Sequence, residues 1–236
     1  EITTRLVGSE MCIRDRIHVT DNFWNKYVHL VKDVIIPYQW DILNDKLEDV
    51  ETSHCIENFK IAAGEKEGEF QGAVFQDTDV AKWLEAVGFV LNYERDEKLE
   101  ELADETIELI GRAQQPDGYL NTYFTIKEPD GRWSNLMEGH ELYTAGHMIE
   151  AAVAYYEATG KRRFLEIVSK FADLVCQTFG PEEGKIHGYP GHQEIELGLL
   201  RLYEVTGKEN YKDLARYFIE PVSYTHLRAH ETRSNL

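Results

Sequence analysis

The chain has 236 residues, with 43 Asp and Glu against 25 Lys and Arg, and therefore a formal net charge of −18. No window approaches the ~18 consecutive apolar residues that a membrane helix needs, so a membrane partner is not expected. An acidic chain whose basic residues are dispersed among carboxylates repels a phosphate backbone, which argues against a nucleic-acid partner. The 42% of apolar residues suits one globular domain.

The two ends of the chain are related through a single DNA string. A ten-codon string that encodes residues 6–15 as LVGSEMCIRD encodes VSYTHLRAHE on the opposite strand, and this is the sequence of residues 222–231. A natural chain has almost no chance of containing such a pair, and the string resembles a common transposase-type sequencing adapter. We therefore interpret residues 1–16 and 222–236 as adapter-derived and residues 17–221 as the natural segment.

Apolar residues recur at helical spacing through nearly all of the natural segment. Asp77 or Thr78 can cap one helix at its N-terminus, and the pairs Thr159-Gly160 and Thr206-Gly207 predict two helix ends. Pro37 is expected to divide the first two helices. The predicted helices, in chain order, are 21–35, 38–49, 78–93, 97–114, 139–158, 162–178, 191–205 and 208–219.

A repeated pattern groups these helices into hairpins. Residues 149–161 match 195–208 up to one inserted residue, and 84–93 is a weaker copy. Each copy precedes a second amphipathic helix, which predicts three helical hairpins. One helix of each hairpin is apolar on most sides and its partner carries a charged stripe, so we expect an inner and an outer layer. The predicted fold is all-α, an α/α barrel or toroid with fewer helices than six hairpins would supply.

The predicted arrangement places four unusual loops at one rim. If the first helix of each hairpin is the inner one, the inner helices are parallel and their N-termini share an end of the barrel. Loops 75–79, 136–143 and 187–194 precede these helices, and loop 114–123 opens to the same end. Aromatic rings beside neutral donors and carboxylates suit the recognition of a neutral sugar.

Five side chains on or near this rim have competing interpretations. His140 and His192 occupy equivalent positions before inner helices and are candidates for ligand binding, with a capping or core role as the alternative. His147 lies two turns beyond His140 and is expected in the core. Asp77 and Asp79 are expected to cap a helix, with ligand contact as the alternative.

The sequence offers little for a metal or a nucleophile. His140-Glu141 followed by His147 lacks the i, i+4 spacing of a zinc-binding HExxH helix, so we expect no metal site. Three Cys form neither a CxxC pair nor a disulfide framework. Cys55 and Cys176 have no nearby base in sequence and are expected to be inert buried thiols.

Four motifs resemble glycoside hydrolase family 127, the bacterial β-L-arabinofuranosidase family. They are FQDTDVAKWLEA at 75–86, QQPDGYLNTYF at 114–124, the segment GHELYTAGHMIEAAVAYYEATGKRRFL at 139–165, and the segment that begins GYPGHQEIELG and spans 188–219. The resemblance covers essentially all of 17–221. It implies the N-terminal portion of an (α/α)6-barrel catalytic domain.

The resemblance also implies an activity and a site. The family hydrolyses β-L-arabinofuranosides with retention, so the expected partner is an arabinose-containing carbohydrate from plant-type glycans or glycoproteins. His140 and His192 match family histidines that contact the arabinofuranose ring, and Gln39 is expected beside the same pocket. The family nucleophile is a zinc-bound cysteine held by further cysteines and a glutamate, with a separate glutamate as acid/base.

Neither Cys55 nor Cys176 matches that zinc-bound cysteine. The resemblance therefore predicts that zinc and the catalytic residues belong to a longer parent protein, and that this chain alone is inactive. Two other functions stay open: a sugar epimerase or unsaturated-glycan hydrolase on the same barrel, and a non-catalytic glycan-binding protein. The sequence does not set the oligomeric state, and the lack of a signal-peptide pattern slightly favours a cytoplasmic location.

Overall fold

The computed structural model describes residues 19–220, and the two ends interpreted as adapter-derived, 1–16 and 222–236, lie outside the described residues. Within 19–220 the regular elements are helical, and the strand-like pairing is limited to an isolated bridge between Phe179 and Ile186. The all-α prediction is confirmed. In this part of the chain, no helix is long and apolar enough to cross a membrane.

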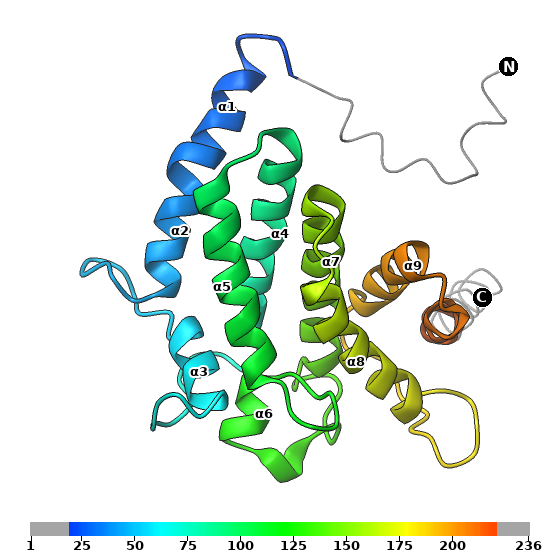
Figure 1. The fold of residues 1–236 in the computed structure, drawn as a ribbon. Helices are drawn as coiled ribbons and strands as arrows, with labels where there is room; N and C mark the ends of the chain where they lie inside the picture. The colour runs from blue at the N-terminus through cyan, green and yellow to red at the C-terminus, as the bar shows by residue number, and fades with distance from the viewer. Residues whose placement is uncertain (1–18, 221–236) are drawn as a thin grey trace, which may run out of the picture.

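The first helical segment is continuous through Pro37. It consists of α1 (Trp24–Leu30), a π-helical stretch η2 (Val31–Ile35) and α2 (Ile36–Leu43), stacked end to end in Figure 1. The predicted break at Pro37 is therefore wrong. The wider π turn lies directly before α2, and Pro37 is in the first turn of α2. Proline has no backbone N–H, but the N–H groups of a first helical turn have no partner within that helix, so proline is tolerated there.

The second predicted helix ends earlier than expected. It was predicted to reach residue 49, but α2 ends at Leu43 and Asp45 adopts a left-handed φ of 55°. The Asp45 carboxylate accepts hydrogen bonds from the backbone N–H of Ser53 at 2.6 Å and of His54 at 3.0 Å. These bonds close residues 45–53 into a loop, which the apolar spacing alone did not indicate.

Three short elements were not predicted. They are α3 (Cys55–Ala62), α6 (Thr122–Ile126) and the 3₁₀ turn η3 (Pro129–Gly131). Two of them are shorter than two helical turns, too short for apolar periodicity to be visible. The Asn121 side chain caps α6 by accepting from the Phe124 N–H at 3.1 Å.

The six long helices form the three predicted hairpins. They are α4 (Asp77–Tyr93) with α5 (Glu97–Ala113), α7 (Glu141–Thr159) with α8 (Arg163–Thr178), and α9 (Ile195–Thr206) with the helix at 209–220. Gly160 and Gly207 end α7 and α9 in the left-handed conformation, with φ of 73° and 71°. These two predicted helix ends are confirmed.

Helix α7 lies between α4 and α9 and packs against both. Glycines allow the close approach, because a Cβ at Gly88 would lie 2.9 Å from the Ala154 carbonyl carbon and one at Gly198 would lie 3.0 Å from the Gly146 oxygen. Helices α5 and α8 pack on the outside and are joined by an ion pair between Arg163 and Glu108. The hairpins α4–α5 and α7–α8 thus have the predicted inner and outer helices.

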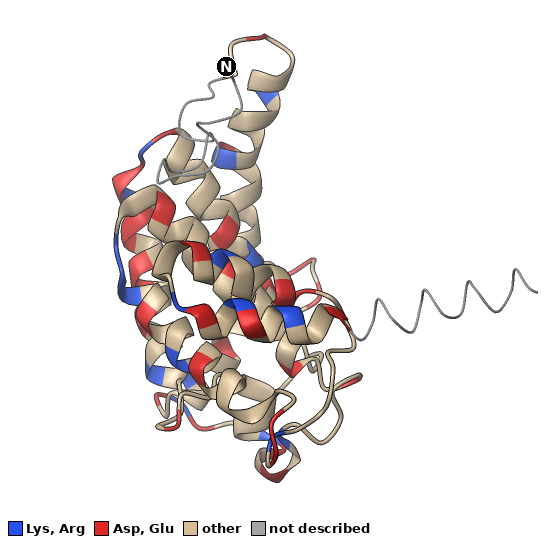
Figure 2. Ribbon diagram, turned by 90° about the vertical axis from the view of Figure 1, so that its right-hand side faces the viewer, with Lys and Arg blue, Asp and Glu red and all other residues tan. Residues whose placement is uncertain are grey.

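Acidic residues outnumber basic ones, and the two are interspersed along the helices (Figure 2). One basic residue lies between the inner helices. Arg201 of α9 pairs with Glu150 of α7 at 3.2 Å, with Glu85 of α4 at 3.4 Å and with Glu157 of α7 at 3.7 Å. This guanidinium therefore contacts all three inner helices.

Candidate functional site

The N-termini of α4, α7 and α9 share one end of the inner layer, as the hairpin pattern predicts. The loops that precede α7 and α9 touch there, because the Gly191 N–H donates to the Leu136 carbonyl at 3.3 Å and Gly191 lies against Met137. The loop before α4 reaches the same place through Phe75, whose ring is 5.1 Å from that of His140. Three loops far apart in sequence therefore line one rim.

His140 and His192 are in direct contact on this rim. Their Nε2 atoms are 3.1 Å apart, and the two rings lie 4.9 Å apart at an interplanar angle of 31°. His140 Nδ1 is 2.6 Å from the Glu138 carbonyl oxygen, which can only accept. With both rings neutral, His140 carries its proton on Nδ1 and accepts at Nε2 from His192, an assignment that follows from the hydrogen bonds. His192 Nδ1 is then an acceptor, suited to a ligand hydroxyl.

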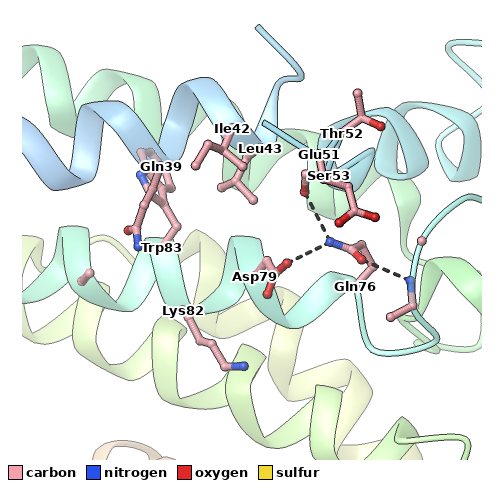
Figure 3. Close-up of a pocket in the computed structure, with 13 residues that line it drawn as sticks. Gln39, Ile42, Leu43, Glu51, Thr52, Ser53, Gln76, Asp79, Lys82 and Trp83 are labelled. Atoms are coloured by element: carbon pink, nitrogen blue, oxygen red, sulfur yellow. Dashed lines mark hydrogen bonds between the residues drawn. The ribbon is translucent and has the colours of Figure 1, made fainter. Parts of the chain in front are cut away.

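A cavity of about 730 Å³ opens between α2, the 51–53 loop and the first turns of α4 (Figure 3). Gln39 and Asp79, two of the predicted site residues, both line it. Gln39 is brought there because α2 packs on α4. The Trp83 indole N–H donates to the Ile36 carbonyl at 3.0 Å, and the Trp83 ring lies 4.5 Å from that of Trp40 at an interplanar angle of 32°.

Gln76 organises the polar side of this cavity. Its amide Nε2 donates to Asp79 Oδ2 at 2.8 Å and to Ser53 Oγ at 3.3 Å, and its Oε1 accepts from the Ala73 N–H at 3.2 Å. Partial burial raises the pKa of the Asp79 carboxyl, and the nearby Lys82 opposes that rise. The cavity therefore presents amide, hydroxyl and carboxylate groups, which together can bind hydroxyls as donors and acceptors.

Lys82 and Tyr143 connect the cavity to the histidine pair. Lys82 lines the cavity, and its Nζ lies 3.3 Å from the Tyr143 hydroxyl and 3.2 Å from Thr78 Oγ1. The Tyr143 ring in turn lies 5.4 Å from that of His192 and 5.8 Å from that of His140. The structure thus brings four predicted residues, at positions 39, 79, 140 and 192, into one continuous region.

Sequence reasoning did not single out Gln76 or Lys82. The signal was present, since Gln76 precedes Asp79 by three positions and Lys82 follows it by three, which places the three side chains on neighbouring turns of one helix face. The contact between Lys82 and Tyr143 joins positions 61 apart and has no signal in the spacing.

Asp77 does not line the cavity. It is the first residue of α4, its side chain is buried, and both of its oxygens accept from Thr122, one from the backbone N–H at 2.7 Å and one from the hydroxyl. Burial raises the pKa of this carboxyl to about 6, and the bonds from Thr122 oppose the rise. Through these hydrogen bonds, Asp77 links loop 114–123 to the start of α4.

Glu141 links loop 114–123 to the start of α7, and it was not identified as a site residue from the sequence. Its side chain is fully buried, and it accepts from the Tyr119 hydroxyl and, at 2.7 Å, from the Trp133 backbone N–H. Burial raises the pKa of Glu141 to about 7, while the two hydrogen bonds and Arg132 act in the opposite direction. The sequence around Glu141 does not distinguish it from a solvent-exposed glutamate in the first turn of a helix.

His147 lies below the pair, as a mostly buried side chain. Its Nδ1 is 3.0 Å from Glu194 Oε1, and its ring meets that of Tyr143 edge-on at 4.5 Å. Burial lowers the pKa of His147 to about 4. Its Nε2 has no hydrogen-bond partner within residues 19–220. The sequence predicted a core position for His147, and the side chain is mostly buried.

The cysteines are separate from one another and from the histidine pair. Cys55 is buried at the start of α3 and contacts the Gln76 carbonyl at 3.3 Å, whereas Cys176 lies on α8 near the Asn210 carbonyl. Burial raises the pKa of both thiols, that of Cys176 to about 12, so both are protonated at neutral pH.

These residues do not fit the zinc site that the family resemblance implies. Over the described range 19–220, no three His, Cys, Asp or Glu side chains are grouped so that they could hold a metal ion. A zinc-bound cysteine requires several ligands around one thiolate. We therefore derive no chemical step through zinc from this part of the protein.

Comparisons with known proteins agree on one family. A family model described as the GH127 catalytic domain of β-L-arabinofuranosidase matches residues 16–236. A non-reducing end β-L-arabinofuranosidase of Bifidobacterium longum subsp. longum is 44% identical over an alignment of 220 positions, which covers 86% of this chain and 33% of the relative.

Solved structures give the same picture. The crystal structure of a GH127 β-L-arabinofuranosidase from Geobacillus stearothermophilus T6 matches with a TM-score of 0.85 and 64% identity, covering 86% of this chain and 32% of that one. A second GH127 β-arabinofuranosidase matches with a TM-score of 0.82 and 36% identity, covering 89% and 34%. The chain thus spans about one third of the length of these relatives.

Proposed function

Because the chain belongs to glycoside hydrolase family 127, we propose that residues 17–221 are the N-terminal portion of an (α/α)6-barrel catalytic domain in a longer protein, here called the parent. The parent is proposed to be a retaining hydrolase that releases β-L-arabinofuranose from plant-type glycans or glycoproteins. The names of the matched relatives support β-L-arabinofuranose as the released sugar, and the three hairpins support the barrel.

Within the parent, we assign sugar binding to the rim described above. One observation carries this assignment: the contacting imidazoles of His140 and His192 meet the cavity of Gln39 and Asp79 through Tyr143 and Lys82. An imidazole lone pair, an amide and a carboxylate bind sugar hydroxyls, and aromatic rings cover the C–H face of a sugar.

The residues described here bind and orient, and we assign none of them a covalent step. Both thiols are protonated and lie away from the histidine pair, so neither is proposed as the nucleophile. The thiolate nucleophile, its zinc and the acid/base carboxyl are proposed to come from the rest of the parent. Asp77 contributes indirectly, by holding loop 114–123 at the rim.

Incubation of the purified parent with aryl β-L-arabinofuranoside tests the function. We expect release of the aryl alcohol together with free L-arabinose, and no release from the α-anomer. Full activity after removal of zinc by a chelator would count against the zinc-dependent mechanism. An epimerised sugar without aryl release would favour the epimerase alternative, and binding without any conversion would favour a glycan-binding protein.

The proposal for the chain ends has a separate test. Sequencing the source DNA through both junctions should show that the codons for 1–16 and 222–236 are absent from the genomic locus. A locus that carries these codons as continuous sequence would refute the adapter interpretation without affecting the family assignment.

A further inference from the structure

We propose that Glu141 is a positioning residue that fixes His140, and through it His192, in the geometry that binds the sugar. This inference rests on the proposed function. It concerns a residue that touches neither the cavity nor the exposed edges of the two imidazoles, and that acts through the backbone on which His140 is mounted.

Glu141 directly follows His140 and begins α7. Its carboxylate has two fixed partners from two different loops, the Tyr119 hydroxyl from loop 114–123 and the Trp133 N–H from the segment that leads into His140. A carboxylate at the first residue of a helix also interacts favourably with the helix dipole. The contacts therefore tie the start of α7 to both approaching loops at one buried point.

The backbone that Glu141 holds is unusual at two places. His140 and Trp133 both have positive φ, 53° and 61°, a conformation that residues other than glycine adopt only when the surroundings enforce it. His140 has no side-chain capping bond of its own at the helix start. The Glu141 carboxylate accepts from the N–H of Trp133, and Glu141 directly follows His140 in the sequence. Glu141 therefore connects the two ends of the segment that has these positive φ angles.

The other end of that segment is fastened by aromatic packing. The Trp133 ring lies 5.2 Å from the Tyr119 ring and 5.3 Å from that of Phe179, and the Arg132 guanidinium sits 3.9 Å over the Tyr119 ring. Arg132 also pairs with Asp117 at 2.9 Å. Tyr119 is therefore held from both sides, and its hydroxyl is a rigid donor for Glu141.

Glu141 and Asp77 together set the spacing of the two halves of the rim. Thr122 binds Asp77 at the start of α4, and Tyr119, three residues earlier in the same loop, binds Glu141 at the start of α7. The helix that Asp77 begins carries Asp79, and the helix that Glu141 begins follows His140. Loop 114–123 thus connects the helix start beside the cavity with the helix start beside the histidine pair. Its contact on the histidine side is the hydrogen bond between Tyr119 and Glu141.

The test compares four variants of the parent. Glu141→Ala removes both bonds, and Tyr119→Phe removes one of them. Glu141→Gln retains both, because its amide oxygen can accept from Trp133 and its NH₂ can donate to the Tyr119 oxygen. Val168→Ala, a truncation in the buried core of α8, is the matched control for lost stability. For each variant we measure kcat, KM, the inhibition constant of L-arabinose and the melting temperature.

We expect Glu141→Ala to raise the L-arabinose inhibition constant and KM about tenfold, with a smaller change in kcat, because loss of positioned binding groups weakens ground and transition states alike. Tyr119→Phe should raise both constants severalfold, and Glu141→Gln should restore them to within about twofold. Val168→Ala should lower the melting temperature and leave both constants unchanged.

Unchanged constants in Glu141→Ala, with a melting temperature lowered as in Val168→Ala, would overturn the inference. If Glu141→Ala does not fold, unchanged constants in Tyr119→Phe would overturn it equally. Failure of the proposed function looks different, because His140→Ala and His192→Ala would then also leave the L-arabinose inhibition constant unchanged.

Discussion

At the scale of single residues, the arrangement of His140 and His192 determines what the rim can offer to a ligand. The Glu138 carbonyl accepts from His140 Nδ1 and so fixes the tautomer of His140. Because His140 Nε2 is then an acceptor, the Nε2 contact also fixes the tautomer of His192, which carries its proton on Nε2. The result is one imidazole lone pair available to a hydroxyl without any change of protonation. The sequence indicated that the two histidines are equivalent in the repeat, but not that they touch.

Replacing either histidine by alanine in the parent should reduce kcat/KM on an aryl β-L-arabinofuranoside about tenfold or more. The physical reason is the loss of a hydrogen bond worth on the order of 1–3 kcal/mol once its partner is left unpaired, and about 1.4 kcal/mol corresponds to one decade. The melting temperature should stay nearly constant, because both side chains lie on loops at the rim. A destabilised but fully active His192→Ala would remove that residue from the site.

The buried carboxyl of Asp77 predicts a pH dependence of stability. Its pKa is about 6 in the folded protein and 3.8 as the ordinary value, so the folded state keeps the proton longer. The free energy of unfolding contributed by Asp77 therefore falls as the pH rises from about 4 to about 6, and is constant above that window. Asp77→Asn has no carboxyl to titrate at this position, and its amide can still hydrogen-bond to Thr122.

Unfolding of wild-type parent and Asp77→Asn should be followed from pH 4 to pH 7.5. The stability of the variant relative to wild type should increase over this range by at most about 3 kcal/mol. This is the free energy that corresponds to the rise of the Asp77 pKa from 3.8 to about 6. The opposite dependence expected from His147, whose pKa is lowered, is present in both proteins and cancels in the comparison. A constant difference between the two proteins would contradict the burial argument for Asp77.

At the scale of helices, periodicity and the Thr-Gly ends predicted the hairpins well, since α7 and α9 depend on local spacing and on glycine in the left-handed region. The errors fall where specific hydrogen bonds decide the structure. The π turn before Pro37 and the Asp45 loop, for example, depend on hydrogen bonds that no apolar pattern encodes. The Glu141 and Lys82 contacts of the site were missed for the same reason.

Arg201 should be required for the packing of the three inner helices. Arg201→Met leaves Glu85, Glu150 and Glu157 close together and without their shared cation, which should destabilise the fold by about 3 kcal/mol. Thermal and urea unfolding of the parent measure this loss. Arg163→Met is the matched control, because it removes an exposed ion pair with Glu108 and should cost less than about 1 kcal/mol. Equal losses in the two variants would contradict the role of Arg201.

At the scale of the whole molecule, the inner layer of this chain has an uncovered apolar surface. Leu197 and Leu200 of α9 are 54% and 36% exposed. In a closed barrel, further hairpins would cover such positions. Exposed apolar side chains on one face of a helix favour self-association.

We therefore expect the 236-residue chain, expressed alone, to be inactive on aryl β-L-arabinofuranoside and to self-associate. Size-exclusion chromatography and thermal unfolding test the second point. The parent, purified in the same way, serves as the control and should elute as one species and unfold cooperatively. A soluble monomer with a sharp melting transition from the 236-residue chain would show that the missing hairpins are not needed for folding.

The position of bound sugar tests the proposed sugar-binding rim most directly. We expect a crystal structure of the parent soaked with L-arabinose to show the sugar at the rim, with hydroxyls within hydrogen-bonding distance of His192 Nδ1 and of the Gln39 or Asp79 side chain. Sugar bound elsewhere in the barrel, with His140 and His192 still paired and free of contact to it, would contradict the proposed site.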